Sequence, residues 1–127
     1  MEKKRILIAD DVRAIRILLA AALRSCGYEI DIAENGIEAL SLIENKQYDL
    51  IITDYIMPEM DGLELTRRVK EKYPSIPILI LTAEGFKDDF LRSGATACVV
   101  KPFDINELKK IIQDLLDKKV KPAEEGK

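Results

Sequence analysis

The sequence has no histidine and only two cysteines among its 127 residues. Cys26 and Cys98 lie in separate segments and form neither a CxxC pair nor a cluster with histidine. The usual ligand sets of a zinc site are therefore missing, and a soft transition metal has no suitable donors. Both thiols are instead typical of small apolar residues in a reducing compartment.

Long apolar runs are also missing. No stretch approaches the roughly 20 residues that a helix needs to cross a bilayer, and the opening Met-Glu-Lys-Lys-Arg contains no apolar segment of signal-peptide length. We therefore expect a cytoplasmic location and no membrane contact. The 20 basic and 23 acidic residues are interleaved and leave a net charge of −3. Because they form no basic stripe, direct nucleic-acid contact is not expected.

What the sequence does contain is a set of short, mostly apolar runs that each stop at a polar residue. With 47% apolar residues, the chain has the composition of one folded domain. The runs at residues 6–9, 50–53, 78–81 and 98–100 end at Asp10-Asp11, Asp54, Thr82 and Lys101. Short β-branched runs without alternation indicate strands buried on both faces, as in a parallel sheet covered by helices. A fifth segment alternates apolar and polar residues and predicts a strand nearer the sheet edge, at Tyr28, Ile30 and Ile32.

Apolar residues at helical spacing predict helices between these strands. In the first helix, which ends before Gly27, they are Val12, Ile15, Leu18, Leu19, Ala22 and Leu23. In the second they are Ile37, Leu40 and Ile43, and a third helix is predicted at residues 63–73. A short helix at residues 86–93, closed by Gly94, would follow the fourth strand.

A capping box of Asp104 and Glu107 predicts the start of the last helix. Its continuous apolar face consists of Ile105, Leu108, Ile111, Ile112, Leu115 and Leu116. Five strands alternating with five helices indicate right-handed crossovers and a doubly wound α/β fold, although this pattern does not set the strand order.

Two segments predict irregular structure. The sequence Pro-Glu-Met-Asp-Gly at residues 58–62 predicts a turn, since proline fixes φ and glycine permits a positive φ. Residues 118–127 are polar and contain Pro122 and Gly126, which is typical of a frayed tail or of a linker shortened by truncation. We accordingly place one domain at residues 1–118 and a polar tail or truncated linker at residues 119–127.

The carboxyl ends of parallel strands form the ligand-binding edge of such a sheet, so the polar residues at the run ends should meet there. Asp54 is a candidate nucleophile toward phosphorus; its alternative role is an acidic cap on the turn before Pro58. Asp10 and Asp11 could hold a cation beside it, or one of them could simply cap the following helix. Three close carboxylates raise one another's pKa unless a cation is present, and Mg²⁺ suits such ligands.

Lys101 and Thr82 complete this set, and each has a plainer alternative. The ammonium of Lys101 could neutralise the acids and pair with a phosphoryl oxygen, or it could reach solvent along its stem. Thr82 could donate a hydrogen bond to a phosphoryl oxygen, or it could be an ordinary β-branched strand residue. The interpretation therefore depends on the joint position of these residues at the ends of apolar runs.

These residues resemble the receiver domain of two-component response regulators. The resemblance rests on Asp10-Asp11, the sequence Ile-Thr-Asp-Tyr-Ile-Met-Pro-Glu-Met-Asp-Gly at residues 52–62, Thr82-Ala83 and Lys101-Pro102-Phe103, and it extends from residue 4 to about residue 117. It implies a flavodoxin-like fold, with a five-stranded parallel sheet of order 2-1-3-4-5 and helices on both faces.

The resemblance also implies a role for each residue of the site. Asp54 would accept a phosphoryl group from a histidine kinase or phosphotransfer protein. Mg²⁺ would be held by Asp10, Asp11, Asp54 and the backbone carbonyl of Ile56.

Two later residues have implied roles as well. Lys101 would form the salt bridge of the site, and Thr82 would move toward the phosphoryl group. The Lys101-Pro102 peptide would be cis, otherwise a minority state for a bond before proline. Output would pass through contact with a downstream protein. Beyond this self-catalysed transfer and slow autodephosphorylation, no enzymatic activity is expected.

Two features depart from the family pattern. The interval between Thr82 and Lys101 is a few residues shorter than usual, which predicts a short or displaced fourth helix. Cys98 stands three positions before Lys101, where the family usually has a switch aromatic. A thiol offers far less contact area than a ring, so the usual coupling of phosphorylation to the surface of the fourth helix, fifth strand and last helix is in question.

These departures motivate an alternative function, that of a receiver-like protein-binding module without phosphorylation. A phosphohydrolase is a third hypothesis, but Tyr55 and Ile56 stand where such an enzyme needs a second acid. Ile56 and Glu84 should flank the path of the water that hydrolyses the phosphoryl group, and Ile56 should impede it. The sequence does not identify the kinase, the output target or the oligomeric state.

Overall fold

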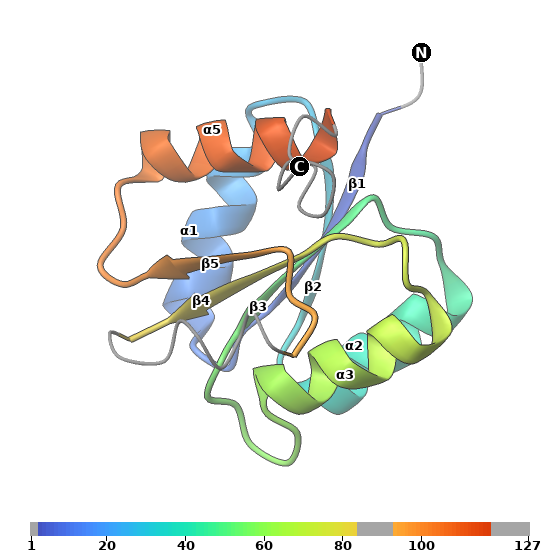
Figure 1. Ribbon diagram of the computed structural model, residues 1–127. Coiled ribbons are helices and arrows are strands. Elements are labelled where there is room, and N and C mark those ends of the chain that lie inside the picture. Colours follow the sequence, from blue (N-terminus) through green and yellow to red (C-terminus); the bar gives the residue numbers. More distant parts are fainter. Residues whose placement is uncertain (1–2, 84–92, 118–127) are drawn as a thin grey trace, which may run out of the picture.

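The fold is built on one parallel sheet of five strands (Figure 1). The computed structural model describes residues 3–83 and 93–117. The strands are β1 (Arg5–Ala9), β2 (Glu29–Ala33), β3 (Leu50–Asp54), β4 (Ile78–Thr82) and β5 (Ala97–Val100). Their order is β2-β1-β3-β4-β5, which confirms the order implied by the family resemblance.

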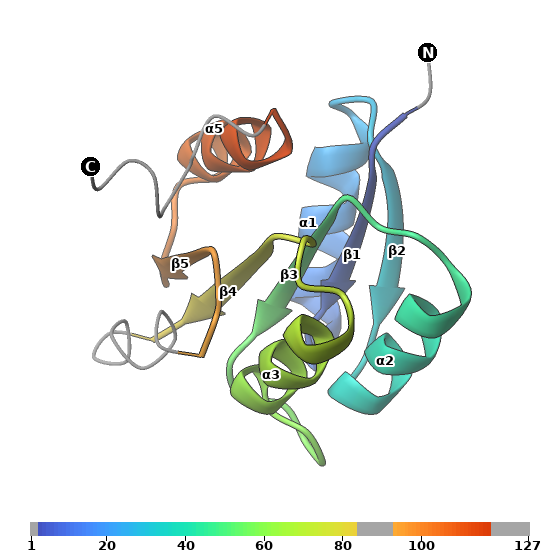
Figure 2. The ribbon, with the colours of Figure 1, turned by 45° about the vertical axis from the view of Figure 1, so that its right-hand side comes forward.

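Helices cover both faces of this sheet (Figures 1 and 2). One face carries α1 (Arg13–Arg24) and α5 (Ile105–Leu116), and the other carries α2 (Gly36–Asn45) and α3 (Gly62–Lys72). Residues 86–92 of the helix expected at residues 86–93 lie outside the described part of the chain. In the described part of the chain, no helix has the length and apolar character needed to span a membrane.

Two hydrophobic cores explain why the strand sequences lack alternation. Successive side chains of a strand point to opposite faces. Ile6 and Ile8 of β1 therefore pack toward α1 and α5, whereas Leu7 packs toward α2 and α3. All three are fully buried. The edge strand β2 is less buried, as its alternating sequence predicts, and Ile32 is 40% exposed.

The predicted apolar faces of α1 and α2 are partly wrong. Leu18 of α1 is 53% exposed, whereas Arg16 in the same helix is only 8% exposed. Ile37 of α2 is 51% exposed, because this helix packs through the smaller Gly36 and Ala39 together with Ile43. Helical spacing identifies apolar residues, but close contact between backbones selects small ones.

Short polar side chains begin three of the helices. Asn35 accepts a hydrogen bond from the Glu38 amide at α2, and Asp61 accepts one from the Glu64 amide at α3. Asp104 accepts hydrogen bonds from two amides at the start of α5, as its predicted capping role requires.

The glycine at the start of α3 is required by a close approach. Its N–H donates to the carbonyl of Tyr55 at 2.7 Å, and a Cβ on Gly62 would overlap the carbonyl oxygen of Asp54. The prediction that Gly62 supplies a positive φ is wrong, because Glu59 adopts that conformation in the turn, with φ 72°. Gly62 instead lets the α3 backbone pack directly on the end of β3.

Replacing this glycine should destabilise the fold. In Gly62→Ala the new methyl group meets backbone that cannot rotate away, so we expect the free energy of unfolding to fall by about 1–3 kcal/mol. Urea denaturation would measure it, with Gly27→Ala as a control, because Gly27 has φ 96° and open space around its Cβ position. Both variants should lose stability, but only Gly62→Ala should shift the Tyr55 amide resonance. A Gly62→Ala protein as stable as the parent would contradict this account.

Candidate functional site

The strand register brings two acids to the same level at the edge of the sheet. Ala9 of β1 pairs with Thr53 of β3, so Asp10 and Asp54 each follow a paired residue. Asp10 is fully buried and Asp54 is 8% exposed. Two carboxylates therefore end adjacent strands in a largely dry environment.

The register of β4 and β5 brings a hydroxyl and an ammonium to the same edge. Thr82 pairs with Val100, and the N–H of Lys101 donates to the Thr82 carbonyl at 2.7 Å. The Lys101 Nζ lies 2.9 Å from Oδ1 of Asp54. The side chain of Lys101 is 30% exposed, so its ammonium contacts the acid instead of extending fully into solvent.

Asp11 joins the two buried acids although it is exposed. Carboxylate oxygens of Asp10, Asp11 and Asp54 all lie within 4.8 Å of one another. Asp10 also takes part in the turn that follows, because its Oδ1 accepts a hydrogen bond from the Val12 amide at 2.9 Å. The alternative that one of these acids caps the following helix is wrong, because the N-cap of α1 is Val12 and that helix start has no side-chain cap hydrogen bond; Oδ1 of Asp10 stabilises the turn before the helix instead.

Burial is the main cause of the unusual electrostatics of Asp10. Burial raises the pKa of the Asp10 carboxyl above its ordinary value, and the hydrogen bond from the Val12 amide lowers it again in part. Among the smaller effects, the charges of Asp54 and Asp11 raise the pKa and the charge of Lys101 lowers it. Repulsion between the acids, which the sequence suggested as the cause, is therefore secondary. The Oδ2 atom of Asp10 has no hydrogen-bond partner among the described residues and lies 3.9 Å from the Lys101 ammonium.

This set of donors fits a hard divalent cation. Three carboxylates and one ammonium leave two negative charges when all the acids are ionised. A buried carboxylate oxygen without a partner is costly, and Mg²⁺ prefers a small number of carboxylates together with water and phosphate oxygens. The residues present would therefore hold Mg²⁺ more readily than a metal that prefers nitrogen or sulfur.

Thr82 lies at the end of β4 and carries a buried hydroxyl. The residue is 1% exposed, and its Oγ1 has no hydrogen-bond partner within residues 3–83 and 93–117.

Other expectations at this edge have mixed outcomes. The Lys101-Pro102 peptide is cis as predicted, the side chain of Ile56 is 67% exposed, and Glu84 lies outside the described residues. Cys98 is partly buried and packs against the core under α2 and α3.

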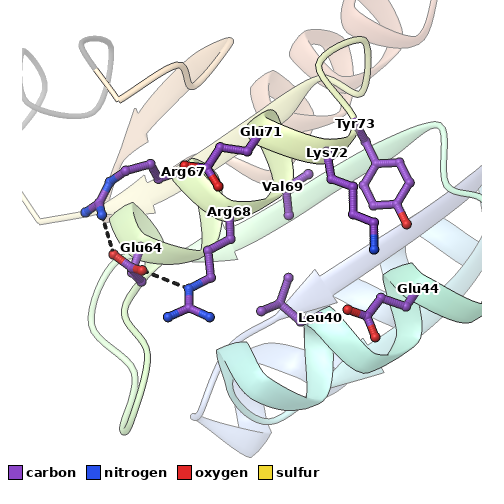
Figure 3. A pocket seen from close by; sticks show the side chains of 9 residues that line it. All are labelled: Leu40, Glu44, Glu64, Arg67, Arg68, Val69, Glu71, Lys72 and Tyr73. Carbon is purple, nitrogen blue, oxygen red and sulfur yellow. Dashed lines mark hydrogen bonds and ion pairs between the residues drawn. The ribbon is translucent and has the colours of Figure 1, made fainter.

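A separate groove lies between α2 and α3 (Figure 3). Its lining residues are Leu40, Glu44, Glu64, Arg67, Arg68, Val69, Glu71, Lys72 and Tyr73. Glu64 pairs with both arginines, at 2.6 Å and 2.8 Å. The groove contains none of the three clustered acids, so it does not contribute to their chemistry.

The fold and this edge define a known class of protein. The family model of the response regulator receiver domain matches residues 6–113. The chain therefore belongs to the receiver domains, which serve as phosphoacceptor switches in two-component signalling.

Curated relatives contain this domain as one part of a longer protein. The chain is 42% identical over 117 residues to the sensor protein EvgS of Escherichia coli K12, covering 90% of the chain and 10% of that protein. It is 40% identical over 107 residues to the response regulator MprA of Mycobacterium sp. strain KMS, covering 82% of the chain and 46% of that protein. The chain thus spans half or less of the length of these two relatives.

Solved receiver structures match almost end to end. The chemotaxis response regulator CheY4 of Vibrio cholerae superposes with a TM-score of 0.86 at 35% identity, covering 90% of this chain and 99% of that one. The response regulator TrrA of Thermotoga maritima gives a TM-score of 0.83 at 42% identity, covering 88% of this chain and 98% of that one. The TrrA structure is a complex with Mg²⁺ and BeF.

The burial of Asp10 has a consequence for stability without metal. Because its folded-state pKa is raised, ionised Asp10 disfavours folding at neutral pH. In Asp10→Asn, Oδ1 can still accept from Val12, so the variant should unfold at higher urea concentration than the parent at pH 7 in EDTA.

The difference in stability between Asp10→Asn and the parent should shrink as the pH falls. As the pH falls through the raised pKa toward the ordinary value of 3.8, the parent gains stability and the advantage of Asp10→Asn disappears. Urea midpoints measured across that range would test it. An Asp10→Asn protein less stable than the parent at pH 7 without metal would show that burial of the charge is not costly.

Proposed function

We propose that Asp54 is the phosphoryl acceptor of this receiver domain. The observation that carries the proposal is the position of its carboxylate, which is 8% exposed at the end of β3 and contacts the Lys101 ammonium at 2.9 Å. Partial burial limits the solvation of the nucleophile, and the strand holds it in place. The neighbouring carboxylates of Asp10 and Asp11 would attract the metal ion on which the transfer depends.

The metal ligands are proposed to be Asp10, Asp11, Asp54 and the backbone carbonyl of Ile56. The close approach of the three carboxylates supports this set, and the family resemblance adds the carbonyl. Bound Mg²⁺ would neutralise charge on the transferring phosphoryl group.

The transfer itself is an in-line displacement. A carboxylate oxygen of Asp54 forms the new bond to phosphorus while the bond from phosphorus to the donor nitrogen of a phosphohistidine breaks, and the electron pair returns to that nitrogen. Lys101 shifts its ammonium from the carboxylate toward a phosphoryl oxygen and offsets its charge. Hydrolysis by water later restores the free carboxylate slowly.

Thr82 would detect the new group. Its buried hydroxyl can donate to a phosphoryl oxygen, and this new hydrogen bond would favour one of two arrangements of the neighbouring loop. Cys98 occupies the position of the family's switch aromatic, so we infer that the change is transmitted without the movement of a ring there.

The surroundings of the domain follow from the same proposal. A histidine kinase or phosphotransfer protein in the cytoplasm would donate the phosphoryl group, and a downstream protein would bind the phosphorylated domain. We place the receiver at residues 1–118 and a polar tail or linker at residues 119–127. The alternative of a module without phosphorylation has no support in the site, because the acids and Lys101 lie together as the reaction requires.

Phosphorylation should depend on Asp54. Incubation of the parent chain with Mg²⁺ and acetyl phosphate should add the mass of one phosphoryl group, and Asp54→Asn should add none because its amide is not a nucleophile. Asp61→Asn is the matched control, since asparagine retains the N-cap of α3. Phosphorylation of the Asp54→Asn protein to the level of the parent would identify another acceptor.

Ile56 should slow the loss of the phosphoryl group. Its side chain is 67% exposed beside the acceptor strand, where an apolar group would hinder the approach of water. Ile56→Asn should hydrolyse roughly fivefold faster, equivalent to about 1 kcal/mol in the barrier. Ile17→Asn on α1, where the residue is 56% exposed, should leave the rate unchanged. A slower rate in Ile56→Asn would refute the prediction.

A further inference from the structure

Arg16 is a buried charged residue that the proposed chemistry does not use. It lies in α1, where helical spacing favoured Leu18 for the buried face, yet Arg16 is 8% exposed and Leu18 is 53% exposed. Burying a guanidinium is costly unless its donors are satisfied. The groups that Arg16 contacts therefore indicate its role in the structure.

The short contact of Arg16 is with backbone. Its Nη1 donates to the carbonyl oxygen of Asp10 at 2.8 Å. Its Nη2 lies 4.0 Å from Oε2 of Glu34, whose side chain is 72% exposed. A pair of that length with an exposed carboxylate contributes little, so the carbonyl is the partner that matters.

This bond is one of three that hold Asp10 in place. The Asp10 N–H donates to the Ala33 carbonyl of β2 at 3.1 Å, and Oδ1 accepts from the Val12 amide at 2.9 Å. With Arg16 on the carbonyl, the Asp10 backbone and one carboxylate oxygen are all engaged. The remaining oxygen, Oδ2, has no hydrogen-bond partner among the described residues and lies 3.9 Å from the Lys101 ammonium.

The geometry of the site requires such a constraint. Adjacent side chains on a continuing strand point to opposite faces, but Asp10 and Asp11 both place an oxygen in the same cluster. The backbone must therefore leave strand geometry directly after β1. The carbonyl that Arg16 holds belongs to the peptide unit that joins the two acids.

We propose that Arg16 is a positioning residue, which orients the Asp10-Asp11 peptide so that both carboxylates can bind one Mg²⁺ ion. The inference rests on the proposed metal site. It also predicts that removing Arg16 changes the Mg²⁺ affinity in the direction opposite to that expected from charge alone. Removing a nearby positive charge should strengthen cation binding, whereas releasing the peptide should weaken it, as loss of an outer contact to a metal ligand commonly does.

Arg24 provides a matched control in the same helix. Its Nη2 donates to the carbonyl of Ile30 in β2 at 3.1 Å, so it also joins α1 to a strand carbonyl. The two arginines are eight positions apart, or about 12 Å along the helix. Loss of either bond should lower stability, but only loss of the Arg16 bond should reach the metal site.

The test is the Mg²⁺ dissociation constant of the whole chain, measured by isothermal titration calorimetry. Arg16→Gln should weaken binding about tenfold, and the amide resonance of Asp11, which belongs to the same peptide, should shift. Arg24→Gln should change neither quantity. Unchanged or tighter Mg²⁺ binding in folded Arg16→Gln would overturn the proposal.

A second pair of variants covers the case in which Arg16→Gln does not fold. Arg16→Lys keeps the charge, but its ammonium ends one atom short of the guanidinium Nη atoms and cannot hold the Asp10 carbonyl in the same geometry, so binding should weaken by about threefold, while Arg24→Lys should match the parent. If Arg16→Lys bound Mg²⁺ as tightly as the parent, the positioning role would be overturned. Failure of the parent itself to bind Mg²⁺ would instead overturn the metal site on which the inference rests.

Discussion

The structure depends on carboxylates held together at the edge of a parallel sheet with too few positive charges nearby. The oxygens of three acids lie within 4.8 Å of one another, and the ammonium of Lys101 contacts Asp54 at 2.9 Å. Burial raises the pKa of Asp10, so the fold accepts an unfavourable charge at this point. Such a site gains stability from a bound cation, which would also offset the negative charge that a phosphoryl group adds at Asp54.

The rest of the fold positions this edge. Two cores bury the central strands β1, β3 and β4 on both faces, so their carboxyl ends are held firmly in place. Gly62 brings the start of α3 against the end of β3. Arg16 and Ala33 hold the backbone of Asp10 from α1 and from β2. Residues far apart in the sequence are thereby fixed relative to one another before any ligand arrives.

Much of this arrangement could be predicted from the sequence. Buried strands have recognisable β-branched runs, and in a parallel sheet their ends identify the ligand edge, so Asp10, Asp54, Thr82 and Lys101 could be named as neighbours. The strand order came from the family resemblance, because hydrophobic pattern carries no information on which strands pair. The structure confirms the cis peptide before Pro102.

Other features depend on backbone contacts that a pattern of side chains does not reveal. The burial of Arg16 follows from a carbonyl that needs a donor, whereas helical spacing recognises only apolar residues and therefore favoured Leu18. Gly62 was expected to serve a positive φ, but close packing is its actual constraint. For Asp10, proximity of acids in a motif suggested repulsion, while the depth of burial emerges only when the chain is folded.

The most direct test of the central claim is the position of a bound hard cation. Crystals grown with Mn²⁺, which shares the preference for oxygen ligands, would locate it by anomalous scattering. The account predicts one strong peak among Asp10, Asp11 and Asp54, with its direct oxygen ligands at about 2 Å. A peak elsewhere on the molecule, or none among these acids at millimolar Mn²⁺, would contradict it.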